Sequence, residues 1–359
     1  MQLIDDELFG FCPTETTPEG ITPKKASLFT LIVAVKDMAR TMHCQRLVHR
    51  IVEKLPCKII FIAIDSEAKE EFLRQNTFSR TLRSGPQPVC CDIMTIQTSP
   101  NLTHQIPFLI LPEIIPDLPV FLLIGHEPWE IAPLVNELLP YVDRIIFDVQ
   151  RFSNIGHFAD QHKQLPQKHT FIDLNWARTK PWREGFLRVF NTQDRLHQLF
   201  TSHTINIRFS QRPSLTTNLF YDSQALLFQA WIASRFNWQP VEFKEEADHI
   251  HIRYRSNDHQ ITVTLSPADS AFIEEGNIIS VECRGENETH FLLSYETDDR
   301  HIAVHASSKD QCEMPYTLFV GSFQRGRALP NEIFQQTASA HYLPLVELLT
   351  HEMWQKNRS

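Results

Sequence analysis

One segment of the sequence has the glycine spacing of a phosphate-binding loop. Gly321 and Gly326 are separated by four residues and follow the apolar run Tyr316–Val320. In such a loop, a lysine and then a serine or threonine follow the second glycine and contact the phosphates and the magnesium ion. Arg327 and Ala328 stand at those positions here. We therefore expect no nucleotide site in this segment, and the spacing GxGxxG occurs nowhere in the chain.

Other sequence motifs that mark catalytic or metal-binding sites are also missing. The 17 histidines form no HExxH motif, and the seven cysteines form no CxxC pair, so neither common type of zinc site is indicated. No GxSxG motif marks a nucleophilic serine. The sequence predicts no catalytic residue, no metal site and no cofactor, and it predicts reduced, mostly buried cysteines.

Tryptophan and arginine are concentrated in one short segment, with Asp173, Trp176, Arg178, Trp182 and Arg183. These two residue types are the most enriched at the energetic centres of protein interfaces. A helix from about Asn175 would place Trp176 and Arg183 on one face with Thr179 between them, and Asp173 would be its N-cap. Two interpretations remain open. The first is direct contact with a partner protein, and the second is an internal latch in which both tryptophans are half-buried against the sheet and Arg178 pairs with Asp148 or Asp173.

Four basic side chains alternate along a predicted strand: His249, His251, Arg253 and Arg255. Successive side chains of a strand point to opposite faces, so these four share one face. No third ligand for a metal is supplied nearby. The alternatives are a solvated sheet face and a docking surface for an acidic patch on a partner.

The composition is that of a soluble globular protein. Of 359 residues, 42% are hydrophobic and 21% are charged, close to the average for globular domains. The formal net charge of -9 disfavours nucleic acid as a partner, because such binding needs a surplus of Lys and Arg. No apolar run reaches the roughly 18 residues of a membrane span, and the acidic start lacks the layout of a signal peptide. We predict a cytoplasmic protein that contacts no membrane.

Hydrophobic periodicity divides the chain into an arm and two domains. Residues 1–26 show no periodicity and are predicted to be a flexible arm. Buried apolar runs alternate with amphipathic helices over residues 27–195, which indicates an α/β domain with a mostly parallel sheet and flanking helices. Residues 196–359 contain several runs with period-two alternation, which indicates an α+β domain built on an antiparallel meander.

Four further features are the segment Ile106–Pro119 with Asp117, the strand from Asp143 and Arg144 to Asp148, the segment Asp173–Arg183, and the helix around Trp231. Together these segments resemble the OpcA family of glucose-6-phosphate dehydrogenase assembly proteins. The resemblance runs in co-linear order from about residue 28 to the end. It implies a non-enzymatic protein that binds glucose-6-phosphate dehydrogenase, assists its assembly and activates it allosterically. The alternative is an α/β enzyme or sensor that acts on a sugar phosphate at the ends of the parallel strands.

Overall fold

The computed structural model describes residues 24–52, 55–82, 89–148, 155–164, 170–211, 223–246, 249–256, 259–296, 298–320 and 341–350. The chain divides into two compact units. The first comprises Met1–Asp148, Pro166–Leu174 and Leu329–Thr337, and the second comprises Val149–Leu165, Asn175–Ala328 and Ala338–Ser359. Residues 1–23 of the expected arm and the loop from Gly321 to Gly326 lie outside the described residues. The last residues of the arm are described, and Lys24 and Lys25 form a short strand that pairs with Val89 and Cys90.

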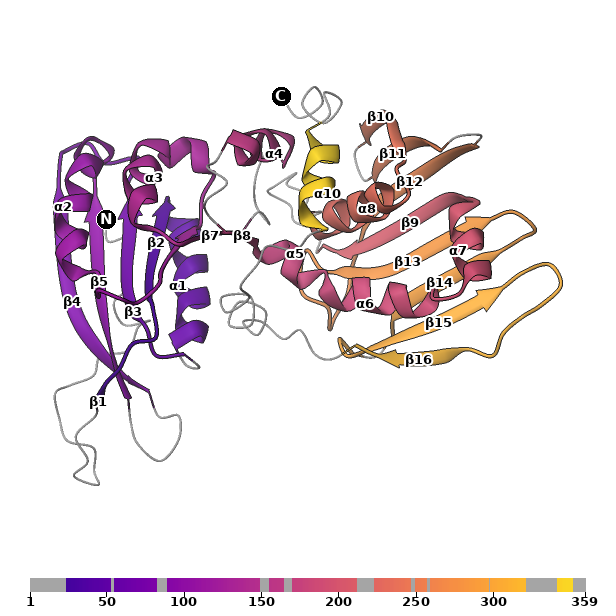
Figure 1. The fold of residues 1–359 in the computed structure, drawn as a ribbon, viewed down its shortest axis with the longest axis horizontal. Helices are drawn as coiled ribbons and strands as arrows, with labels where there is room; N and C mark the ends of the chain where they lie inside the picture. The colour runs from indigo at the N-terminus through magenta and orange to yellow at the C-terminus, as the bar shows by residue number, and fades with distance from the viewer. Residues whose placement is uncertain are drawn as a thin grey trace. The chain divides into compact units, whose positions relative to one another are not determined.

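The first unit is built on sheet A, whose strand order is β1-β5-β3-β2-β6-β7-β8 with β4 paired to β5 (Figure 1). All pairings are parallel except that of β4 with β5. The elements are β1 Lys24–Lys25, β2 Thr30–Lys36, α1 Met38–Val52, β3 Lys58–Ile64, β4 Leu73–Leu82, β5 Val89–Thr98, η2 Pro100–Gln105, α2 Ile106–Ile110, η3 Leu111–Glu113, β6 Val120–Ile124, η4 Pro128–Ile131, α3 Ala132–Leu138, η5 Leu139–Tyr141, β7 Arg144–Phe147 and β8 Thr170–Asp173.

The central strands of sheet A are buried on both faces, as their continuous apolar sequences predict. Leu31, Val33 and Val35 of β2 form one apolar cluster with the helix α1, while Ile32 and Ala34 point to the opposite face and are equally buried. Each such side chain contributes roughly 1.5–3 kcal/mol by leaving water. The buried strands therefore hold the residues at their ends in fixed positions.

The second unit is built on sheet B, with strand order β10-β11-β12-β9-β13-β14-β15-β16. Every described pairing is antiparallel except that of β12 with β9, so β9 is inserted into the predicted meander. The elements are α4 Ile155–Gln164, α5 Leu174–Arg178, α6 Lys180–Val189, α7 Gln193–Phe200, β9 Ser202–Ser210, α8 Ser223–Arg235, β10 Gln239–Glu246, β11 His249–Ser256, β12 His259–Ala268, β13 Ile278–Gly285, β14 His290–Tyr295, β15 His301–Ser307, β16 Tyr316–Phe319 and α10 Tyr342–Leu349.

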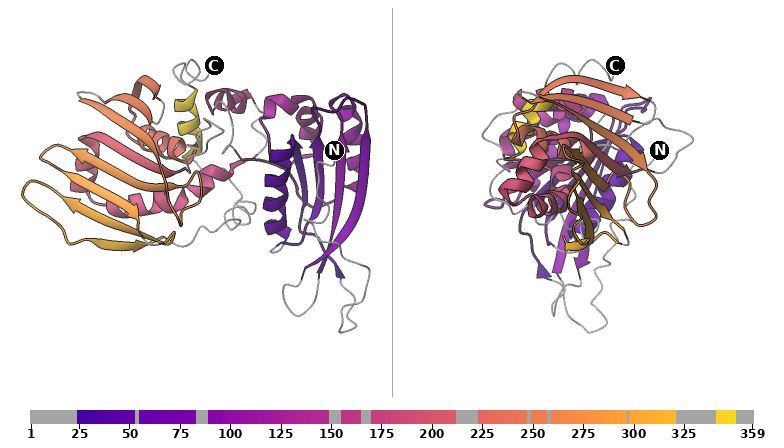
Figure 2. Two further views of the ribbon diagram at one scale, coloured as in Figure 1. Left: turned by 180° about the vertical axis from the view of Figure 1, so that it is seen from behind. Right: turned by 90° about the vertical axis from the view of Figure 1, so that its right-hand side faces the viewer.

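Sheet B has one face covered by helices and one without them. In the rear view of Figure 2 the strands lie in front of α6 and α8, and no described helix covers them on that side. The burial pattern agrees: in β11, Ile250, Ile252 and Tyr254 are buried, whereas the side chains between them are exposed or half-exposed. This alternation confirms the α+β prediction for the second half of the chain.

The chain leaves the first unit earlier than the sequence suggested. The predicted domain boundary lies at residue 195, whereas the second unit already includes the segment from Asn175 onward. The reason is packing: Phe186 of α6 lies 5.5 Å from Phe228 of α8, ring centroid to ring centroid, and Trp182 donates to a strand of sheet B. Among the described residues, no helix combines the length and apolarity needed to cross a membrane.

Candidate functional site at the carboxyl edge of sheet A

The topological switch point of sheet A lies between β2 and β6. β2 pairs with β3 on one side and with β6 on the other, and the chain runs from β2 through α1 to β3. In open parallel sheets, ligands bind beyond the carboxyl ends of the strands where the strand order reverses. The side chains that follow β2 and β6 therefore form the candidate site; the two strands themselves are drawn in Figure 1.

Asp37 is the whole connection between β2 and α1. The strand ends at Lys36 and the helix begins at Met38, and Asp37 adopts a left-handed φ of 71°. Its Oδ1 accepts a hydrogen bond from the Arg40 amide at 2.8 Å, as the side chain of a helix N-cap does. In dinucleotide-binding sheets this helix end receives the pyrophosphate. Here the chain's own carboxylate occupies that position.

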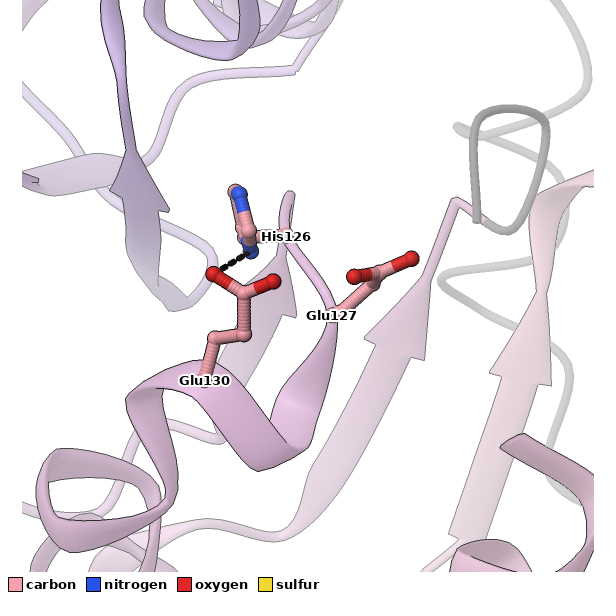
Figure 3. A group of neighbouring side chains, drawn as sticks. All are labelled: His126, Glu127 and Glu130. Atoms are coloured by element: carbon pink, nitrogen blue, oxygen red, sulfur yellow. Dashed lines mark ion pairs between the residues drawn. The ribbon is translucent and has the colours of Figure 1, made fainter. Parts of the chain in front are cut away.

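Three ionisable side chains follow β6: His126, Glu127 and Glu130 (Figure 3). His126 and Glu127 are buried, and Glu130 lies in the short helix η4. The imidazole Nδ1 of His126 is 3.8 Å from Glu130 Oε2, and its Nε2 is 3.3 Å from Asp37 Oδ2. Lys36 Nζ donates to Glu130 Oε2 at 2.8 Å. This hydrogen bond lowers the pKa of Glu130 below its ordinary value.

A further carboxylate follows β7. Asp148 is 1% exposed, and its Oδ2 lies 2.9 Å from Nε2 of His43 on α1. Burial, and then the charge of Asp148, raise the pKa of the neighbouring Cys44 to about 12, so this thiol stays protonated at neutral pH and is a poor nucleophile. The carboxyl edge thus gathers the carboxylates that follow β2, β6 and β7. Such an arrangement attracts cations and repels phosphate groups.

The predicted signature residues of the first unit lie at its strand starts and turns. Asp117 occupies an exposed turn with a φ of 65°, closed by a hydrogen bond from Leu118 N to Ile115 O. Asp143 Oδ2 accepts from Val120 N at 2.8 Å, which ties the start of β7 to the start of β6. Arg144 lies over the Phe121 ring at 5.5 Å, and burial lowers its pKa.

Asp173 ends β8 in the first unit, where it pairs with Phe147. The Trp and Arg side chains of the Trp/Arg segment make their described contacts within the second unit. Asp173 directly precedes α5, the position expected of an N-cap. The Arg183 guanidinium carbon lies 3.5 Å from the centre of the Trp176 ring, and Arg183 Nε donates to Thr179 Oγ1 at 3.1 Å. The predicted face with Thr179 between Trp176 and Arg183 is therefore present. Arg178 Nη1 donates to Asn175 Oδ1 at 2.8 Å.

Both remaining tryptophans of the signature are buried in an aromatic cluster between α6, α8 and sheet B. Trp182 is 2% exposed and Trp231 is 4% exposed. The Trp182 ring lies 4.9 Å from the Tyr295 ring in an edge-on arrangement, and its Nε1 donates to Ile278 O at 3.2 Å. Trp231 lies 6.1 Å from the ring of Phe186. Trp182 of the Trp/Arg segment and Trp231 of α8 therefore pack inside the second unit.

The four basic side chains of β11, which we call the cationic stripe, are His249, His251, Arg253 and Arg255. All four lie on the face of sheet B that no described helix covers, and each is exposed or half-exposed. Arg253 forms an ion pair with Glu242 of β10, and His251 Nε2 lies 3.9 Å from Glu246 Oε2. The sequence alone showed the four basic residues. It did not show that strand pairing places carboxylates beside His251 and Arg253.

Comparison with known protein families shows to which family the chain belongs. Residues 48–164 match a family profile described as the N-terminal domain of a glucose-6-phosphate dehydrogenase subunit. Residues 169–358, more than half of the chain, match the profile described as the C-terminal domain of that subunit. The chain belongs to the OpcA family.

Relatives named OpcA are about a quarter identical to this member of the family over the aligned segments. A Synechocystis sp. protein is 28% identical over 197 residues, which cover 52% of this chain and 38% of the relative. A Synechococcus elongatus protein is 24% identical over 241 residues, covering 65% of this chain and 52% of the relative. The matches therefore span about half or less of the length of these relatives.

Solved structures share the two-unit fold of this OpcA family member at low sequence identity. Glucose-6-phosphate 1-dehydrogenase from Mycobacterium avium aligns with a TM-score of 0.55 and 12% identity, over 92% of this chain and 93% of its own. KijD10, a 3-ketoreductase from Actinomadura kijaniata, aligns with a TM-score of 0.54 and 9% identity, over 94% of this chain and 97% of its own. At these identities the likeness shows a common fold alone.

Sequence reasoning missed the cluster at the carboxyl edge. His126, Glu127 and Glu130 follow an apolar run, and the spacing of one, then three residues puts all three near the same strand end. That signal was available, but it matches no common ligand motif. Asp37 carried no signal of its own, since its role depends on the strand and helix on either side of it.

Proposed function

We propose that this protein binds glucose-6-phosphate dehydrogenase as a non-catalytic partner, promotes its assembly and activates it allosterically within the oxidative pentose phosphate pathway. The family supports this proposal, because both matched profiles are described as domains of a subunit of that dehydrogenase. The curated relatives are named for the OxPP cycle. We propose that it acts in the cytoplasm.

The observation that carries the non-catalytic part of the proposal is the closure of the phosphate position by Asp37. The fold is shared with a reductase solved in complex with NADP, so the scaffold itself is compatible with a dinucleotide. In this chain the connection between β2 and α1 is a single residue, and its carboxylate caps the helix. A glycine-rich turn that lets backbone amides approach a pyrophosphate does not fit in a one-residue connection.

Electrostatics strengthens this argument. A phosphate bound at the end of α1 would face the carboxylate of Asp37 and, beyond it, Glu130 near the end of β6. Two like unit charges about 4 Å apart repel by roughly 4 kcal/mol at the effective dielectric of a protein surface. A dinucleotide or a sugar phosphate would meet this repulsion in addition to losing the amide donors of the helix. The edge therefore favours a non-catalytic role over the alternative of a sugar-phosphate enzyme or sensor.

For the docking surface we propose the uncovered face of sheet B that carries the cationic stripe. Its side chains are solvent-exposed on a rigid, paired strand, which limits the entropy lost when a partner orders them. Glu242 and Glu246 lie beside the stripe, so the free positive charge is concentrated toward Arg255. An acidic dehydrogenase surface would gain mainly in association rate from such a rim of charge.

The experiment combines kinetics and complex formation with purified proteins. Alone, the chain is expected neither to reduce NADP with glucose 6-phosphate nor to bind NADP in calorimetry. Added to its cognate dehydrogenase, it should form a complex in light scattering and should raise turnover or lower the apparent KM until a defined stoichiometry is reached. NADP reduction by the chain alone would refute the non-catalytic role. Unchanged kinetics without any complex would refute the partnership.

A further inference from the structure

We propose that His126, Glu127 and Glu130 bind one divalent transition-metal ion of the Mn²⁺ or Zn²⁺ type. One potential ligand atom from each side chain lies within 4.8 Å of the others. The three side chains lie beyond the end of β6 (Figure 3), where the imidazole faces the carboxylate of Glu130 and the carboxylate of Glu127 lies to one side. This spacing is wider than a loaded site would show, so the two glutamate side chains would have to rotate toward the imidazole when an ion binds.

The buried imidazole is the observation that points to a ligand. His126 is 8% exposed, and its Nδ1 has no hydrogen-bond partner although the atom is inaccessible to water. A buried polar nitrogen without a partner costs free energy. The atom faces Glu130 Oε2 at 3.8 Å, a separation that a bound cation would bridge. A metal ion would thus satisfy the nitrogen and the carboxylate together.

Asp37 supplies the support that metal-binding histidines ordinarily have. Its Oδ2 lies 3.3 Å from Nε2 of His126, and this negative charge favours the tautomer with the proton on Nε2. The lone pair then lies on Nδ1, on the side of Glu127 and Glu130. Carboxylates that orient a ligating imidazole in this way typically contribute about 10–100-fold in metal affinity.

The mixture of donor atoms selects the class of ion. One imidazole nitrogen with carboxylate oxygens suits Mn²⁺ and Zn²⁺, whereas Ca²⁺ takes oxygen ligands alone and Mg²⁺ retains most of its water. Three protein ligands leave coordination positions for water. Thiolates play no part in this set, which separates it from the zinc sites that sequence motifs usually reveal.

Lys36 acts as the competitor of the ion. Its Nζ donates to Glu130 Oε2 at 2.8 Å, and its side chain is 25% exposed, so the ammonium group has room to move into solvent when a dication arrives. Removing this charge should therefore tighten metal binding, and removing a ligand should weaken it. Replacing Lys36 and replacing Glu130 should thus change the metal affinity in opposite directions.

The test uses Mn²⁺ and the full chain after treatment with a chelator. Free Mn²⁺ is followed by electron paramagnetic resonance during titration, and imidazole coordination is read from the nitrogen coupling of the bound ion. We expect one site with nitrogen coupling. Glu130→Gln and His126→Ala should weaken binding at least tenfold, and His126→Ala should remove the coupling. Asp37→Asn keeps an N-cap at α1 and should weaken binding by about 10–100-fold.

Two further variants keep the outcome decisive. Lys36→Met should bind Mn²⁺ several-fold more tightly than wild type, a result that damaged folding would not produce. Glu113→Gln is the matched control, because Glu113 also pairs with a partly buried lysine of the same unit, Lys58 at 2.5 Å, and it should bind as wild type does. Equal binding by wild type and Glu130→Gln, or bound Mn²⁺ without nitrogen coupling, would overturn the proposal. The result is independent of the dehydrogenase.

Discussion

Replacing Trp182 by alanine tests whether the Trp/Arg segment acts as a latch inside the second unit. The indole is 2% exposed and contacts Tyr295 and Phe228 in edge-on geometry. Truncation of a buried tryptophan to alanine costs about 3–5 kcal/mol through lost burial and the cavity left behind. The hydrogen bond to Ile278 O is lost as well, and a net bond of this kind contributes about 1 kcal/mol.

A loss of about 4 kcal/mol translates into a large change in melting temperature. For a unit of 150–250 residues, each 1 kcal/mol shifts the melting temperature by about 2–4 °C. Trp182→Ala should therefore melt about 8–16 °C below wild type when the isolated protein is followed by calorimetry. Leu187 lies on the same helix and is 57% exposed. Leu187→Ala is the matched control, and we expect it to change stability by no more than about 0.5 kcal/mol.

Binding to the dehydrogenase separates the two interpretations of the segment. A latch residue lowers the melting temperature of the protein by itself, and its effect on affinity disappears at temperatures where the variant is fully folded. An interface residue leaves melting intact and costs about 2 kcal/mol or more in affinity. If Trp182→Ala melts with wild type but binds the dehydrogenase at least tenfold more weakly, the latch reasoning is wrong.

Three further predictions concern other parts of the chain. A Cβ at Gly125 would lie 2.2 Å from Cys44 Sγ, so Gly125→Ala should lower stability by about 1–3 kcal/mol. Adding Cys44→Ala should restore part of the loss in urea unfolding, and no restoration would refute the clash. Burial lowers the pKa of His162 from 6.5 to about 4, so the unfolded chain takes up this proton first and stability falls as the pH drops from 6.5 toward 4. His162→Phe should flatten this decline, and an unchanged slope would contradict the assignment. Arg253→Glu with Arg255→Glu should slow association with the dehydrogenase and reduce its salt dependence, with a nearly unchanged dissociation rate in stopped-flow measurements. If this variant associates as fast as wild type at low salt, the cationic stripe is a solvated sheet face and not a docking surface.

The buried strands of sheet A could be predicted because their sequences leave few alternatives. The runs that became β2, β3 and β6 are apolar at every position between their first and last residues, and such runs are typical of strands covered on both faces. β4 was missed. Its sequence from Leu73 to Leu82 is largely polar, and it is a strand because it pairs antiparallel with β5. Only the neighbouring strand defines it, so no local pattern could.

The face shared by Trp176 and Arg183 could be predicted because it depends on helical spacing alone. The predicted single helix is in fact two, α5 and α6, with Thr179 between them. Thr179 Oγ1 donates to Trp176 O at 2.8 Å, and Arg183 Nη2 donates to the same carbonyl at 3.2 Å. The backbone amide of Thr179 also donates to Trp176 O, at 3.2 Å. Side-chain and backbone donors thus converge on the carbonyl of Trp176 where the helix is interrupted.

The candidate site required information that only the folded chain contains. Asp37 and His126 are far apart in sequence and meet because β2 and β6 pair in parallel, with Ala34 opposite Ile124. At the turn where a dinucleotide-binding sheet uses glycine, this chain places an aspartate in the left-handed conformation, a cost that persists when surrounding structure holds the residue there. The same carboxylate caps α1 and orients His126. One residue therefore closes the position for a phosphate and prepares a neighbouring position for a cation.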